Sequence, residues 1–202
     1  KTLTALSIAQ NCNFKNVLFL TKKKAIENIR QDYNSMYFTF DITIINNESL
    51  HTIKSDDFDL IISDEHHRCS AFPKSNNFAK SIKERFGKLP QIYLSGTPTA
   101  ESGSQWYHSF WTSNFSPFRE YKNFYSWAKD FTNKKIKYVG YATINDYSSS
   151  IDEKILKVID RYIISFSQQQ AGFATEISEQ ILHFPITETQ STMIKKLWKD
   201  KV

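Results

Sequence analysis

The 202-residue chain has few of the residues that define several large protein classes. It contains only two cysteines, Cys12 and Cys69, too few for a disulfide framework or a zinc knuckle, which indicates a reducing, cytoplasmic setting. Its five glycines do not form a dinucleotide-binding fingerprint. The longest apolar runs, at 17–20 and 60–62, are strand-sized, so the sequence predicts neither a membrane span nor a signal peptide.

The remaining composition is that of a globular protein that can bury a large core. Hydrophobic residues make up 40% of the chain and aromatic residues 15%, which excludes wholesale disorder. Twenty-six basic and 21 acidic residues give a net charge of +5, which suits a nucleic-acid partner without requiring one. Because no repeat, low-complexity tract or Gly/Ser linker interrupts the sequence, we expect a single domain over 1–202.

Short apolar segments alternate with amphipathic ones in the first half of the chain, which predicts alternating strands and helices. The predicted strands are 16–21, 42–45, 58–63 and 91–95, and the predicted helices are 3–12, 22–36 and a segment that follows Ser75 and runs to about Phe86. This order is typical of an α/β fold whose parallel sheet is covered on both faces. Such sheets bind ligands beyond the carboxyl ends of their strands, so we expect the chemistry in the loops that follow them.

Aromatic residues dominate the segment 104–147, which holds 14 of them in 44 positions. Trp106, Tyr107, Phe110 and Trp111 repeat at helical spacing, so we predict an aromatic-rich helical region whose rings mostly belong to the core. Six basic residues between the rings are expected at the surface: Arg119, Lys122, Lys129, Lys134, Lys135 and Lys137. Rings and basic side chains together can also bind single-stranded nucleic acid, which is the alternative interpretation.

The C-terminal part predicts three further elements. A helix that runs into a strand is expected over 151–164, and another strand over 180–186. Thr187 and Gln190 have the spacing of a capping box, which predicts a final helix. That helix contains Ile194, Leu197 and Trp198.

The segment with the most chemical content is Asp64-Glu65-His66-His67, directly after the third predicted strand. Two adjacent carboxylates at the end of a buried parallel strand are costly unless they serve a function. In phosphoryl transfer, one such acid holds magnesium and the next orients or deprotonates the attacking water. One alternative is an acidic, solvated loop. Another is a metal site of His66, His67 and Cys69 with Asp64, although the spacing is not that of paired zinc ligands.

Three other segments each carry a weaker signal. Ser95-Gly96-Thr97-Pro98-Thr99 follows the last predicted strand, and alone it predicts only a turn. Lys1-Thr2 precedes a helix, as the end of a phosphate-binding loop does, but without the glycines of that loop. Thr21-Lys22-Lys23-Lys24 places a hydroxyl and three amines where a phosphate backbone binds, or simply begins a solvated helix.

Taken together and in this order, the segments resemble the first motor domain of superfamily 2 helicases and translocases. Lys1-Thr2 resembles the tail of the Walker A motif, and residues 18–22 resemble motif Ia. Residues 44–51 resemble the segment before motif II, and residues 58–68 resemble Walker B with a DExH box. Residues 94–99 resemble motif III. Further along, 116–131 resembles the region after motif III in Swi/Snf-type translocases and phage helicases, and 186–190 the segment that leads out of that domain. The resemblance therefore covers essentially the whole chain.

The resemblance implies a RecA-like P-loop NTPase fold, ATP and Mg²⁺ as cofactors, and movement on nucleic acid, with DNA as the expected track in a bacterial or phage-infected cytoplasm. By position in the motifs, the implied catalytic residues are Asp64, Glu65 as general base, and His67. Lys1 would contact the β and γ phosphates, and Thr2 and Asp64 would bind magnesium. The remaining implied roles are coupling, by Ser95, Gly96 and Thr97, and nucleic-acid contact, by Thr21 and Lys22.

The departures from the family pattern are also informative. The glycines that precede Lys1 in the family are absent, and nothing matches the second motor domain, so the chain looks like a fragment that alone would be a poor ATPase. His66 stands in the DExH box where Ala is common. Two alternatives remain open: the motor subunit of a restriction system, which shares these motifs, and a nucleic-acid-binding module that has lost catalysis.

Overall fold

The computed structural model describes residues 1–55, 57–140, 142–166, 170, 172 and 185–199. The chain divides into two compact units, Lys1–Ile163 and Ile164–Val202. The expectation of one domain over 1–202 stays a prediction. The strand predicted at 180–186 lies outside the described residues except for 185 and 186, which have no regular structure.

Four parallel strands form the central sheet, in the order β2-β1-β3-β4. They are β1 (Asn16–Thr21), β2 (Asp41–Asn46), β3 (Leu60–Asp64) and β4 (Gln91–Leu94). All four were expected from their apolar, β-branched composition, within one or two residues at each end. The register pairs Leu20 with Ser63 and Asp64 with Leu94, so β1, β3 and β4 end at the same edge of the sheet. The predicted α/β class with a parallel sheet is confirmed, and this architecture is consistent with a RecA-like domain.

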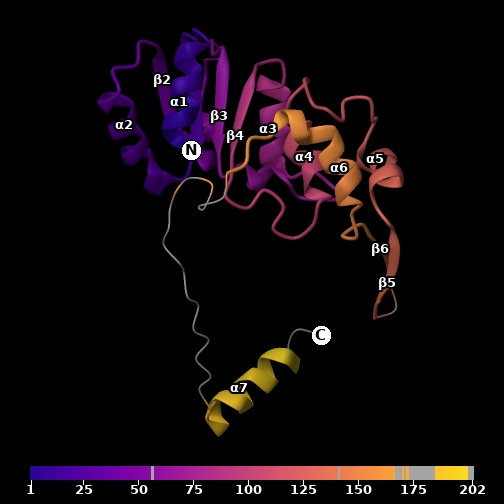
Figure 1. Ribbon diagram of the computed structural model, residues 1–202. Helices are drawn as coiled ribbons and strands as arrows, with labels where there is room; N and C mark the ends of the chain where they lie inside the picture. Colours follow the sequence, from indigo (N-terminus) through magenta and orange to yellow (C-terminus); the bar gives the residue numbers. More distant parts are fainter. Residues whose placement is uncertain (56, 141, 167–169, 171, 173–184, 200–202) are drawn as a thin grey trace. The chain divides into compact units, whose positions relative to one another are not determined.

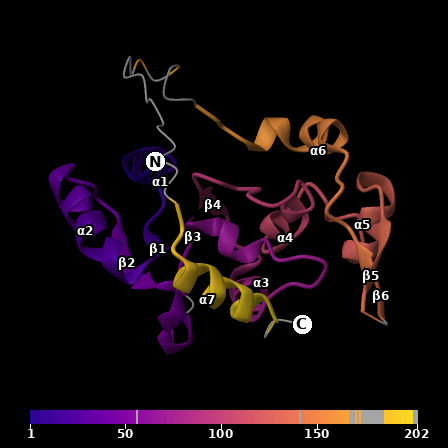
Figure 2. The ribbon, with the colours of Figure 1, turned by 90° about the horizontal axis from the view of Figure 1, so that it is seen from below.

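Helices cover both faces of the sheet (Figure 2). The helices α1 (Thr2–Asn11) and α2 (Ile26–Ser35) pack on one face, and α3 (Asn77–Phe86) packs on the other. Side chains of a strand alternate between faces, so Val17 and Phe19 contact α1 and α2 whereas their neighbours along β1 contact α3. Both faces of β1 are therefore fully buried, as its continuous apolar sequence predicts.

Local hydrogen bonds fix where several elements begin. The Asp59 carboxylate accepts the backbone N–H groups of Lys15 and Asn16 at 2.6 and 3.0 Å, which fastens the start of β1 to the segment before β3. The Asn76 side chain accepts the Ala79 N–H at 2.8 Å and caps α3. The helix predicted at 22–36 begins as a short 3₁₀ turn, η1 (Lys23–Ala25), before α2.

The aromatic segment after β4 forms its own core beside the sheet (Figure 1). The helices α4 (Gln105–Trp111), α5 (Phe124–Phe131) and α6 (Asp152–Ile159) enclose it. We call this core the aromatic cluster; its buried rings are Tyr107, Phe110, Phe118, Phe124, Trp127, Phe131 and Tyr147. The prediction that most rings of this segment are core is confirmed: these seven side chains are at most 9% exposed, and the partly buried Trp106, Trp111 and Tyr121 pack against them.

Two expectations for this part of the chain are wrong. The region 104–147 is helical only through α4 and α5, and then forms the antiparallel hairpin β5 (Lys135–Val139) and β6 (Ala142–Asp146). The alternation of polar and apolar residues in β5 and the turn at Gly140, with φ of +61°, explain the hairpin. The strand expected at the end of 151–164 is absent: α6 continues as the 3₁₀ turn η4 (Asp160–Tyr162), and 163–166 have no regular structure.

The helix α7 (Glu188–Lys199) begins with the predicted capping box. The Gln190 side-chain oxygen accepts the Thr187 N–H at 2.9 Å, and the Thr187 hydroxyl accepts the Gln190 N–H at 3.3 Å. None of the described helices combines the length and the apolar character that a membrane span requires.

Candidate active site

The acidic segment lies where β3 ends and the chain turns sharply. Asp64 is the last residue of β3, and Glu65 precedes the 3₁₀ turn η3 (His66–Cys69). The Glu65 backbone is left-handed, with φ of 53°, a conformation that costs a non-glycine residue roughly 1–2 kcal/mol. Backbone strain of this kind concentrates at functional sites, where surrounding contacts hold it. The turn presents two consecutive carboxylates at the carboxyl edge of the sheet.

Thr21 holds the first carboxylate. Its hydroxyl donates to Asp64 Oδ2 at 2.9 Å, across the β1–β3 pair. The Thr21 side chain is fully buried, with its hydroxyl on the Asp64 carboxylate. The contact with nucleic acid that the sequence resemblance implied for Thr21 stays a prediction.

Glu65 is held by two basic neighbours. Lys22 Nζ lies 3.1 Å from Oε1, and His67 Nδ1 lies 3.3 Å from Oε2. The hydrogen bond from Lys22 lowers the pKa of Glu65; burial opposes this, and the charges of Lys22, His67 and Lys1 add to it. The carboxylate is therefore ionised at neutral pH.

His67 joins the acidic segment to the loop after β4. Its Nδ1 lies 3.2 Å from Ser95 Oγ, which accepts the Thr97 N–H at 3.1 Å. The structure therefore brings together His67, Ser95 and the backbone of Thr97, as the predicted coupling requires. Gly96 has open space on its Cα and takes part in no described side-chain contact.

His66 connects the same turn to the aromatic segment. Its ring stacks on Tyr93 with centroids 3.8 Å apart and an interplanar angle of 9°, and Nε2 lies 2.7 Å from the Ser109 carbonyl in α4. Burial lowers the pKa of His66 to about 4, so the ring is neutral and donates its Nε2–H to this carbonyl. Sequence reasoning considered His66 only as a metal ligand and missed this tether. The single signal for this contact in the sequence was that His66 stands at the position of the DExH box where alanine is common.

The alternative metal site is not formed. His66 Nε2 is engaged with Ser109, and Cys69 is buried with its thiol pKa raised to about 12 by that burial. In the described part of the chain, no group of three or more His, Cys, Asp or Glu side chains lies close enough to hold a metal ion.

The residues at this edge fit a magnesium-bound phosphate. Asp64 offers hard carboxylate oxygens, the ligand type that Mg²⁺ takes together with phosphate oxygens. The helix α1 begins at Thr2 without a side-chain cap, and Lys1 is the residue that precedes it. An uncapped helix N-terminus with an adjacent cation is a general anion-binding arrangement.

Comparison with known proteins agrees with this geometry. Residues 27–100 match the family described as type III restriction enzyme, res subunit, and the matched range contains β2, β3, β4 and the whole acidic segment. The match supports a helicase-like motor domain of superfamily 2. A search of curated proteins found no significant match.

Proposed function

We propose that this chain is the ATP-binding motor domain of an ATP-dependent helicase or translocase, which hydrolyses ATP with magnesium to move on DNA. The observation that carries the proposal is a network of two neighbouring sets of polar contacts at the carboxyl edge of the sheet. It joins Thr21 to Asp64, and Lys22 through Glu65 and His67 to Ser95. Three segments that are far apart in the sequence, each with the pattern of a different helicase motif, thus meet at one place.

Each residue in the network has a distinct task in this proposal. Asp64, oriented by Thr21, holds magnesium together with Thr2, and Lys1 binds the phosphates. Magnesium held there would supply positive charge to the phosphoryl group as it is transferred. Glu65 is the general base that accepts a proton from the attacking water. His67 positions Glu65 and transmits changes at the phosphate site to the Ser95–Thr97 loop.

Lys22 connects the nucleic-acid track to catalysis. Its side chain is 56% exposed while its ammonium is paired with Glu65. A DNA phosphate that attracts this ammonium frees Glu65 from its strongest hydrogen bond, so the pKa of Glu65 rises and the carboxylate becomes a better base. Nucleic acid would therefore stimulate hydrolysis through Lys22.

A second candidate function is the motor subunit of a restriction system. The match of residues 27–100 to the type III restriction family favours it. The motor chemistry is the same in both cases, and the two functions differ in whether a nuclease acts with the motor.

The deciding experiment is ATP hydrolysis by the protein that carries this domain, with and without DNA, beside the Glu65→Gln variant. Stimulation by DNA that disappears in the variant supports a nucleic-acid motor. If both proteins bind DNA in a salt-dependent way and neither hydrolyses ATP, the domain is a binding module and the proposal is wrong.

A further inference from the structure

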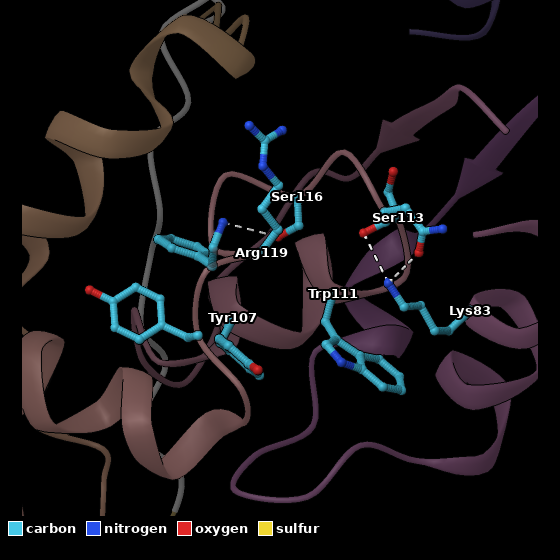
Figure 3. A pocket seen from close by; sticks show the side chains of 9 residues that line it. Lys83, Tyr107, Trp111, Ser113, Ser116 and Arg119 are labelled. Carbon is cyan, nitrogen blue, oxygen red and sulfur yellow. Dashed lines mark hydrogen bonds between the residues drawn. The ribbon is translucent and has the colours of Figure 1, made fainter. Parts of the chain in front are cut away.

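A hollow beside Lys83 has its cation already engaged by the protein (Figure 3). The Lys83 ammonium donates to Asn114 Oδ1 at 2.7 Å and to Ser113 O at 3.3 Å. It also lies 5.7 Å from the Trp111 ring centroid. The Tyr107 ring, which lines the same hollow, is buried in the aromatic cluster. Rings and cations that are open to solvent lie instead on the hairpin of β5 and β6.

The hairpin projects from the end of α5, and its strands form a two-stranded sheet of their own (Figure 1). Its large side chains are exposed: Ile136 by 60%, Tyr138 by 80% and Ile144 by 49%. The register pairs Ile136 with Asn145 and Tyr138 with Thr143, so polar side chains lie opposite the ring. Ile144 lies on the other face, opposite a lysine. The exposed apolar groups are therefore divided between two faces, which leaves no broad apolar surface for a protein partner.

Lysines give the hairpin its charge. Residues 132–146 contain Lys134, Lys135 and Lys137 but only one acidic residue, Asp146. Lys137 Nζ lies 2.7 Å from Asp146 Oδ2, and this hydrogen bond contributes most to lowering the pKa of Asp146 to about 2. Lys134 and Lys135 are exposed and form no ion pair among the described residues. The hairpin thus carries two uncompensated cations, which favours a polyanionic partner.

The same lysines disfavour a further β-strand as the partner. Lys135 and Lys137 lie on β5, which has one edge without a partner strand in this sheet. Lysine on an edge strand is a common means by which proteins prevent another strand from pairing there. A polyanion, in contrast, gains from these charges.

The base of the hairpin is fixed to the rest of the domain. The Asn133 N–H donates to Ser149 O at 2.7 Å, which closes the hairpin below β5 and β6. Tyr147, directly after β6, is buried in the aromatic cluster. The Ser102 hydroxyl, in the segment between β4 and α4, donates to Ser148 O at 2.7 Å. The hairpin therefore presents its exposed side chains from an anchored base.

We propose that the hairpin binds single-stranded DNA, with phosphates on Lys134 and Lys135 and a base stacked on the Tyr138 ring. Basic surfaces with exposed rings bind single strands in this way, because every base has a face that can stack. Lys135 and Tyr138 are roughly 10 Å apart along an extended strand, so a short segment of DNA can reach both. The inference rests on the proposed function in taking DNA as the partner, and it adds a contact outside the candidate active site.

The test is fluorescence anisotropy of a labelled oligothymidylate, and of a labelled duplex of the same length, titrated with the 202-residue chain. EDTA is present and ATP is absent, so hydrolysis cannot affect the result. The variants are Tyr138→Ala, Tyr138→Phe and the double variant Lys134→Gln/Lys135→Gln. Because all three side chains are exposed, urea unfolding should give the same midpoint for every variant.

Matched controls come from other exposed positions. Tyr37→Ala removes a ring that is 90% exposed after α2. Lys80→Gln/Lys88→Gln removes two exposed lysines, on α3 and just after it. These controls measure what the loss of any exposed ring or of any two charges does to binding.

We expect Tyr138→Ala to weaken binding of the oligothymidylate at least about fivefold and Tyr138→Phe to preserve it, since the ring supplies the stacking. The double lysine variant should reduce the steepness of log affinity against log salt concentration by about 1.4, because each phosphate contact with a single strand contributes about 0.7. Neither control should have these effects.

Three results would overturn the proposal. One is an absence of oligothymidylate binding at low salt. Another is an affinity that Tyr138→Ala lowers no more than Tyr37→Ala does, or lowers equally for the duplex, whose bases are already stacked. The third is a salt dependence that the lysine double variant leaves unchanged. The proposed function fails by a different result, the absence of DNA-stimulated ATP hydrolysis in the protein that carries this domain.

Discussion

The carboxyl edge of the sheet and the aromatic cluster are built on opposite principles. The edge consists of polar side chains held by a few hydrogen bonds and ion pairs, from Thr21 to Asp64 and from Lys22 to Glu65. The cluster consists of buried aromatic rings that contact one another. Trp127, for example, contacts four other rings. The contacts at the edge depend on the direction of hydrogen bonds, whereas the packing of the cluster depends on the volume of its side chains. Changes at the edge should therefore alter activity with little loss of stability, and changes in the cluster should do the reverse.

The largest expected effect is on catalysis, at Glu65. Replacing it by Gln removes the general base, so ATP hydrolysis by the protein that carries this domain should fall roughly 10²- to 10⁴-fold while nucleotide binding persists. Glu84→Gln, an exposed position on α3, is the control and should retain the full rate. Steady-state hydrolysis with a separate nucleotide-binding assay checks this. A Glu65→Gln protein that turns over at the normal rate would remove Glu65 from its proposed role.

In the cluster, Trp127→Ala should destabilise the fold strongly. The side chain is fully buried, and truncating such a ring costs about 3–5 kcal/mol of unfolding free energy. Tyr125→Ala, on the same helix but with 44% of its surface exposed, should cost about 1 kcal/mol or less. Urea unfolding of the chain measures both. Equal losses in the two variants would show that the cluster is not the tightly packed core described above.

Two buried histidines should make the stability of the fold depend on pH. Burial lowers the pKa values of His66 and His108 from 6.5 to about 4 each, so between these values the unfolded chain binds protons that the folded chain does not. Stability should therefore be unaffected by these groups above pH 6.5 and fall as the pH drops from 6.5 to 4, by about 3 kcal/mol per histidine. Urea unfolding across this range tests the expectation.

Two variants separate this effect from general acid denaturation. His66→Phe keeps a ring beside Tyr93 but cannot be protonated, and His108→Phe keeps a ring beside Phe124. Each variant should lose the contribution of one histidine. The fall in unfolding free energy that the two histidines cause between pH 6.5 and 4 should therefore be about half as large in either variant. An unchanged slope in both variants would contradict the assignment.

The smallest expected effect is at Lys22. Because this ion pair is more than half exposed on the lysine side, its loss should change rates by less than about fivefold. In Lys22→Gln the basal ATP hydrolysis should rise slightly and its stimulation by DNA should fall. Lys24→Gln, also exposed, is the control and should behave as the unmodified protein. Unaltered stimulation in Lys22→Gln would leave the proposed link between DNA and Glu65 without support.

Several elements could be predicted because their signals are local. The strands follow from short β-branched runs, α3 from its apolar spacing, and the start of α7 from Thr187 and Gln190, which bond to each other three residues apart. The wrong predictions concern segments in which one local sequence pattern favours a helix and another favours a strand. Residues 135–146 share the aromatic and basic composition of α5, and only their alternation and Gly140 distinguish a hairpin from a helix.

From the sequence alone we could predict candidate residues for the chemistry, since the carboxylates, hydroxyls and lysines stand at fixed places after recognisable strands. Only the tertiary structure decided which of them meet. Thr21 and Asp64 are 43 residues apart, as are His66 and Ser109, and each pair forms because of strand order and helix packing. Local periodicity encodes which face a residue takes but not which segment lies beside it. For that reason the burial of Thr21 against Asp64 and the hydrogen bond from His66 to Ser109 could be found only in the fold.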